Sequence, residues 1–130
     1  MNRRAFCGLA AWAALTGTAG AAQSASQEFR IFRKDREIGV HRLDFVTDGK
    51  EARVSIAIDL AVGIGPITFY RYMHRNDERW AGGRLVGFES STSDNGKILA
   101  ARAERVGDML RVQGVDGVTT LPGTTLPTTY

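Results

Sequence analysis

Cysteine is nearly absent from this sequence of 130 residues: the single one, Cys7, lies in the N-terminal stretch. If that stretch is removed, as predicted below, the remaining chain has no disulfide, no thiol nucleophile and no cysteine metal ligand. Histidine is scarce as well. His41 and His74 are far apart in the sequence and belong to no local ligand motif, so no metal site is predicted.

The sequence motifs of common enzyme classes are also missing. There is no Gly-x-Ser-x-Gly elbow, no phosphate-binding Walker loop, no dinucleotide-binding fingerprint and no zinc-binding helix. The turn Asp94-Asn95-Gly96 lacks the spaced oxygen ligands of a calcium loop. We therefore predict no cofactor, assign no catalytic residue and favour a protein that is not an enzyme.

Residues 1–22 have the pattern of a secretory signal peptide. A short basic start precedes a mostly apolar stretch of small residues, and Ala19-Gly20-Ala21 fits a signal-peptidase site. The segment Asn2-Arg3-Arg4-Ala5-Phe6 resembles a twin-arginine signal, so the twin-arginine and general secretory routes both stay open. We expect a periplasmic or secreted protein, with residues 23–27 as a linker and no transmembrane segment after signal removal.

An excess of one charge is lacking once the signal is set aside. Removing Arg3 and Arg4 from the 17 basic residues leaves 15 against 14 acidic residues, a net charge of +1. A nearly neutral surface with interspersed signs does not favour nucleic acid as a partner.

What the sequence does contain is a series of short β-like segments separated by turn signals such as Asp48-Gly49 and Asp94-Asn95-Gly96. The predicted strands are 28–33, 38–46, 53–62, 66–80, 84–92, 97–106, 109–113 and 118–121. Segment 97–106 is rich in alanine and also suits a helix, but its two flanking turns favour a strand. We predict an all-β antiparallel meander over residues 28–121. It forms a curved sheet or a partly open β-barrel, followed by an extended Pro/Thr-rich tail at 122–130.

The clearest strand is 53–62, in which five branched apolar residues alternate with small or polar ones. The apolar set is Val54, Ile56, Ile58, Leu60 and Val62. Since successive side chains of a strand point to opposite sides, we expect this set to face the core.

Segment 66–80 holds the candidate site. Read as a strand, it places Tyr70, Tyr72 and His74 on one face and Phe69, Arg71, Met73 and Arg75 on the other. A helix with Arg71, Arg75 and Arg79 spaced four apart is the alternative, which the Thr, Phe and Tyr content disfavours. The residues proposed to bind a ligand are Tyr70, Arg71, Tyr72, His74 and Trp80.

Each candidate also has a purely structural explanation. The aromatic rings fit a sheet core with hydroxyl groups at its rim. His74 fits a histidine that hydrogen-bonds a neighbouring strand, although beside Glu78 it also fits a general base. The three arginines fit cross-strand pairs with Glu28, Glu89 or Glu104 on a hydrated face.

The chain resembles a family of small exported proteobacterial proteins that is classed only as a domain of unknown function. The residues that carry the resemblance occur in order along the chain: Ile38-Gly39-Val40-His41, Phe69 to Arg75 with Glu78 and Trp80, Gly83-Arg84-Leu85, Glu89-Ser90, Asp94-Asn95-Gly96, Leu121-Pro122 and Leu126-Pro127-Thr128. The resemblance implies a β-rich fold and no known activity. Members usually continue past the Leu-Pro-Thr-x-Tyr segment, so a shortened chain with an unpaired sheet edge is expected here.

Three functions follow for testing. The first is an exported β-domain that binds an apolar or amphipathic ligand such as a lipid. The second is an envelope interaction module that pairs with another protein through an exposed strand edge. The third is a hydrolase that uses His74 with Glu78.

Overall fold

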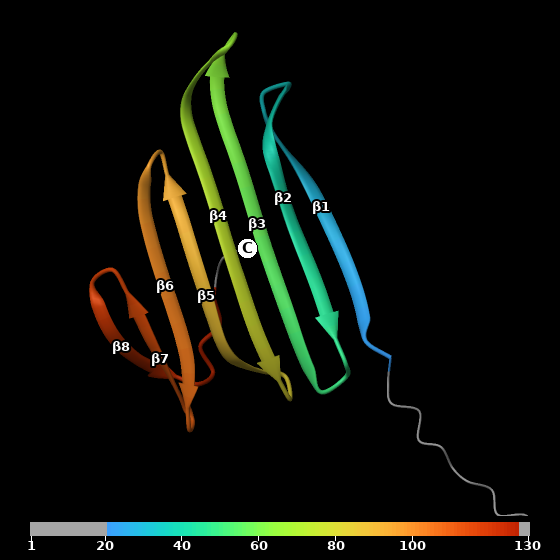
Figure 1. Ribbon diagram of the computed structural model, residues 1–130, viewed down its shortest axis with the longest axis vertical. Coiled ribbons are helices and arrows are strands. Elements are labelled where there is room, and N and C mark those ends of the chain that lie inside the picture. Colours follow the sequence, from blue (N-terminus) through green and yellow to red (C-terminus); the bar gives the residue numbers. More distant parts are fainter. Residues whose placement is uncertain (1–20, 128–130) are drawn as a thin grey trace, which may run out of the picture.

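The computed structural model describes residues 21–127, which form one antiparallel β-sheet. Its strands are β1 (Gln23–Arg33), β2 (Arg36–Thr47), β3 (Glu51–Ile64), β4 (Ile67–Ala81), β5 (Arg84–Asp94), β6 (Lys97–Val106), β7 (Met109–Gly114) and β8 (Gly117–Pro122). Each strand pairs with the next one in the chain. Figure 1 shows a twisted, open sheet with β1 and β8 at its opposite ends. The predicted all-β meander is confirmed as an open, curved sheet.

Several strands are longer than the sequence predicted. β1 begins at Gln23, so residues 23–27, expected as a linker, form its first part. Residues 97–106 form strand β6, and the helix considered for them is wrong. The helix considered for segment 66–80 is also wrong, because β4 is a continuous strand of 15 residues. Residues 1–20 of the expected signal peptide and 128–130 of the expected tail lie outside the described residues.

The predicted turns form where their chemistry requires them. In the β5–β6 turn, Asn95 and Gly96 have positive φ values of 48° and 91°, which asparagine and glycine tolerate better than other residues. In the β2–β3 turn, Asp48 Oδ1 accepts hydrogen bonds from the backbone N–H groups of Lys50 and Glu51 at 2.9 and 2.8 Å. These bonds, led by that of Glu51, lower the pKa of the Asp48 carboxyl.

The two faces of the sheet differ in burial. One of them, here called the inner face, carries the most buried side chains of the described residues. Its buried apolar side chains are Leu43, Val54, Ile56, Leu85, Ala103 and Leu110, and its buried polar ones are His74, Asn76 and Glu78. The alternating set of β3 lies on this face, as expected, with Ile58, Leu60 and Val62 half-buried.

The opposite face, here called the outer face, is hydrated and held by ion pairs between strands. These pairs include Arg42 with Glu28, Arg75 with Asp59, Arg79 with Glu104 and Arg102 with Glu89. Exposed pairs of this kind contribute about 0–1 kcal/mol each. The ion pairs of the outer face therefore add little to the stability of the sheet.

A short segment after β8 fixes one end of the sheet. Arg105 on β6 donates from Nε to the carbonyl of Leu85 and from Nη2 to that of Gly123, both at 2.8 Å. The N–H of Gly123 donates to the carbonyl of Asp108, also at 2.8 Å. In Figure 1 the dark red segment after β8 turns back toward β5. Arg105 thus joins β5, β6 and the start of the tail.

Candidate functional site

The inner face of β4 gathers most of the residues that the sequence singled out. Alternate side chains of the strand line this face: Tyr70, Tyr72, His74, Asn76, Glu78 and Trp80. Four of the five predicted ligand-binding residues are therefore brought to one face. Arg71 is separated from them, because it lies one position out of phase and points to the outer face.

Glu78 is the most buried of these side chains, with no exposed surface. Its Oε1 accepts a hydrogen bond from Asn76 Nδ2 and its Oε2 accepts one from Trp80 Nε1, both at 2.9 Å. The two donors lie two residues before and two residues after Glu78, so the period of the strand places all three on the same face. A buried carboxylate is costly unless it is hydrogen-bonded, and this arrangement supplies two of the bonds it needs.

His74 is 6 % exposed and bonds to the neighbouring strand. Its Nδ1 lies 2.7 Å from Thr92 Oγ1 on β5, and its ring stacks on Tyr72 with centroids 6.5 Å apart. Burial lowers the pKa of His74, and the charges of Arg75 and His41 lower it further. The imidazole is therefore held in its neutral form at neutral pH.

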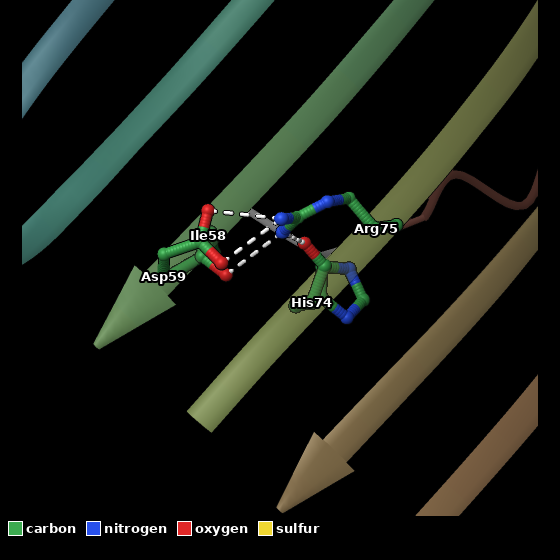
Figure 2. Close-up of polar contacts among 4 residues, drawn as sticks. All are labelled: Ile58, Asp59, His74 and Arg75. Carbon is green, nitrogen blue, oxygen red and sulfur yellow. Dashed lines mark hydrogen bonds and ion pairs between the residues drawn. The ribbon is translucent and has the colours of Figure 1, made fainter. Parts of the chain in front are cut away.

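Arg75, the neighbour of His74 on the outer face, braces the backbone of the site. Figure 2 shows its guanidinium lying against β3. Nη2 donates to both carboxylate oxygens of Asp59, at 2.9 and 3.0 Å, while Nη1 donates to the carbonyls of Ile58 and His74, at 3.2 and 2.8 Å. The planar guanidinium of Arg75, here called the fork, thus joins β3 to β4 beside the cross-strand pair of Ile58 and His74. Arg79 forms the predicted cross-strand pair with Glu104, whereas Arg75 pairs across the strands with Asp59, which was not among the predicted partners.

The arrangement expected for a hydrolase is not formed. His74 and Glu78 lie four positions apart on one strand, a separation of about 13 Å at the usual rise per residue. His74 bonds to Thr92, whereas Glu78 bonds to Asn76 and Trp80. These contacts hold the two side chains in separate hydrogen-bonded groups, so Glu78 does not orient His74 as a general base.

The two histidines are close in the sheet although they are distant in sequence. Ile58 on β3 pairs with His41 on β2 and with His74 on β4, so the two rings flank one aliphatic side chain on the inner face. His41 Nε2, His74 Nε2 and Asn76 Oδ1 are buried atoms without a hydrogen-bond partner. Among residues 21–127, no group of three or more possible metal-binding side chains is found.

A groove lies on the inner face beside this polar row, over β5 to β8. Its volume is about 430 Å³, and its inner-face walls are Ser90, Thr92, Leu99, Ala101, Val112 and Thr119. Small side chains leave this half of the face unfilled, whereas isoleucine, leucine and tyrosine fill the half formed by β3 and β4. Thr92 connects the two halves because its hydroxyl lies both in the groove wall and against His74.

The sequence did not single out the groove as a site. The feature of the sequence that corresponds to the groove is the series of serine, threonine and alanine residues on one face of 84–106. Such a series also fits an ordinary solvated strand. Trp80, which was singled out, lines a different pocket of about 390 Å³ near the β2–β3 turn, and its N–H is directed to Glu78. Tyr70 donates its hydroxyl to Asp94, and this bond raises the pKa of Tyr70.

These features define a single-layer, open β-meander domain with a mixed polar and apolar inner face. A family model described as "Domain of unknown function (DUF6134)" matches residues 29–130, and the chain belongs to this family. Searches of curated proteins and of solved structures found no match. Among the described residues, no helix is long and apolar enough to cross a membrane.

Proposed function

We propose that this chain is a non-catalytic binding domain that holds an amphipathic molecule, such as a lipid, on its inner face. The observation that carries the proposal is the groove over β5 to β8. Its volume of about 430 Å³ lies within the range of about 300–1,000 Å³ that is usual for small-molecule sites.

The lining of the groove supports a ligand of mixed character. Leu99 and Val112 offer apolar contact, while the hydroxyl groups of Ser90 and Thr92 offer hydrogen bonds along the β4 side. An apolar body with one hydrogen-bonding group therefore matches this face better than a fully charged ligand does.

Binding is tested with a fluorescent fatty acid and with mass spectrometry of small molecules that co-purify with the chain. Replacing Leu99 with Trp places a large ring in the groove. We expect Leu99→Trp to weaken probe binding by about tenfold or more, since a loss of about 1.4 kcal/mol has that effect.

Ile98→Trp is the matched control. Ile98 precedes Leu99 on β6, is 63 % exposed and lies on the outer face, so the same ring is added outside the groove. Both variants are first checked for folding by urea unfolding. Equal binding by the two variants, or no binding of any probe by the parent chain, would exclude the groove as the site.

A second candidate function rests on the open ends of the sheet. β1 is an 11-residue end strand in which every residue except Ile31 is exposed, and an end strand of this length can accept a strand from another protein. In this alternative the chain is an envelope interaction module. Its test is capture of partners by the parent chain and by a variant with Ser26→Pro, which removes one N–H from β1. Equal capture by both would count against pairing through β1.

The N-terminal sequence supports a periplasmic or secreted location as part of this proposal. Expression of the full chain, followed by separation of the cell compartments and N-terminal sequencing, tests it. A protein that stays in the cytoplasm with Met1 intact would contradict export, while leaving the groove and its ligand test unaffected.

A further inference from the structure

The β3–β4 hairpin extends beyond the strands on both sides of it. β2 pairs with β3 only as far as Leu60, and β5 pairs with β4 only from Tyr72 onward. Residues 61–71 therefore form a two-stranded ribbon of about 16 Å, at about 3.3 Å per residue. In Figure 1 this hairpin projects past the neighbouring ends of β2 and β5.

The projecting ribbon is apolar and exposed. From Leu60 to Tyr70 the sequence contains no charged residue. At the end of the ribbon, Ile64 and Ile67 pair with each other and are 75 % and 69 % exposed, and Phe69 is 54 % exposed. An isolated two-stranded ribbon has marginal stability in water. Exposed isoleucine and phenylalanine side chains at its end bury no apolar surface within the chain, so a partner that covers them would account for their presence.

Basic residues of the neighbouring β1–β2 hairpin lie beside the ribbon. Arg33, Lys34 and Arg36 come from the adjacent β1–β2 turn, and together with Ile64 and Phe69 they line a pocket of about 630 Å³. Arg36 donates to the carbonyl of Gly63 at 3.2 Å, which joins the two hairpins. The nearby acidic residues are Asp35, Glu37 and Asp94. Glu37 lies 3.5 Å from Arg30, and Asp94 accepts a hydrogen bond from the Tyr70 hydroxyl. With Arg71 at the ribbon base, positive charge is in excess.

We propose that the β3–β4 tip is a membrane-docking element that inserts Ile64, Ile67 and Phe69 into the surface of an anionic lipid bilayer. Apolar groups buried about 5–10 Å into the interface, with basic residues at the headgroups, are the usual pattern of such binding. Arg33, Lys34, Arg36 and Arg71 lie where they meet the phosphates. This site is separate from the inner-face groove and does not depend on the ligand proposed for it.

The shape of the tip favours a bilayer over another protein. A stable protein interface buries about 800 Å² on each partner, whereas this ribbon presents a narrow, convex end with three large apolar side chains. A bilayer surrounds such an end on all sides. The excess of positive charge adds attraction to an anionic surface, and a copy of the same tip would be repelled by it.

The test is flotation of the full-length chain with phosphatidylcholine vesicles, with and without phosphatidylglycerol. The parent chain binds the vesicles that contain phosphatidylglycerol, and added salt weakens the binding. The double variant Ile64→Ser with Ile67→Ser lowers the partition constant by about tenfold or more, because two exposed side chains no longer transfer into the apolar interface. Val106→Ser is the control. Val106 is 63 % exposed, and it lies at the end of β6 that is farther from the β3–β4 tip (Figure 1).

A second measurement places the insertion at the tip and is independent of any binding by the N-terminal stretch. Ile67→Trp fluorescence is quenched by brominated lipids, whereas Val106→Trp fluorescence is not. The proposal is overturned if the two tryptophans are quenched alike, if the double variant binds vesicles as well as the Val106→Ser control, or if the Ile pair instead governs self-association without vesicle binding. Leu99→Trp keeps its vesicle binding, which separates this site from the groove.

Discussion

Trp80 donates its indole N–H to Glu78 Oε2 at 2.9 Å, from the same face of the same strand. This bond turns the indole ring of Trp80 toward the core, although the sequence suggested this ring for ligand binding. Trp80 also packs against the core cluster of Leu43, Val54 and Ile56. It therefore acts as part of the core and as a partner of a fully buried carboxylate.

Trp80→Phe tests this relationship. Phenylalanine keeps an aromatic ring against the core cluster but removes the N–H, so a buried carboxylate oxygen loses a donor. We expect the free energy of unfolding to fall by about 1–3 kcal/mol, measured by urea denaturation. Phe88→Leu, on the same face and paired with Glu78 across the strands, changes packing without removing a polar partner. An unchanged midpoint in Trp80→Phe would contradict the role assigned to the bond.

The buried, neutral His74 makes stability depend on pH. Its pKa in the folded chain is lower than the ordinary value of 6.5, so the unfolded chain takes up the proton first as the pH falls. Stability is therefore complete above about pH 6.5 and decreases below it, until the folded chain is also protonated. Urea midpoints between about pH 7.5 and 5 should fall in the parent chain and fall less in His74→Gln. Equal pH profiles would show that protonation of His74 carries no such linkage.

Most of the fold was predictable because its signals are local. Alternation in 53–62 identified the inner face of β3, and the turns at Asp48-Gly49 and Asn95-Gly96 have the residues that such turns require. The length of β3 was underestimated, since the glycines around residue 65 suggested that this strand ends at Val62, whereas β4 has the predicted length of 15 residues. β3 instead continues to the turn and forms the projecting ribbon together with the start of β4.

The site was predictable only in part, because its contacts depend on the register between strands. Alternation alone separates Arg71 from Tyr70 and His74, and the structure keeps that separation. Nothing local indicates that Ile58 pairs with both histidines or that Thr92 faces His74. The burial of Glu78 could not be foreseen either, since a glutamate in a strand is ordinarily solvated and only the donors on either side make burial tolerable.

The fork of Arg75 leads to a prediction about the outer face. Arg75→Lys keeps the charge but loses the paired N–H groups that hold Asp59 and two carbonyls, so we expect a loss of about 1 kcal/mol. Arg102→Lys is the control, because Arg102 makes one contact of 3.1 Å with Glu89, with both side chains more exposed, and should change stability by less than about 0.5 kcal/mol. Thermal unfolding of the two variants measures whether Arg75→Lys loses more stability than Arg102→Lys. Losses of the same size would remove any special role for the fork.

Gly123 tests whether the segment after β8 is held by a specific fit. A Cβ at this position would clash with the carbonyl oxygen of Asp108 and the guanidinium of Arg105, whereas one at Gly114 would meet no atom within 4 Å. Gly123→Ala should therefore displace the segment and cost about 1–3 kcal/mol, since Arg105 and Asp108 lose hydrogen bonds. Gly114→Ala should be neutral or slightly stabilising, because alanine restricts the unfolded chain. Hydrogen exchange of the Gly123 and Leu110 amides, compared with that of a Gly114→Ala chain, reports the displacement directly. If Gly123→Ala leaves the Arg105 contacts and the exchange rates of its neighbours unchanged, the segment is not held by this fit.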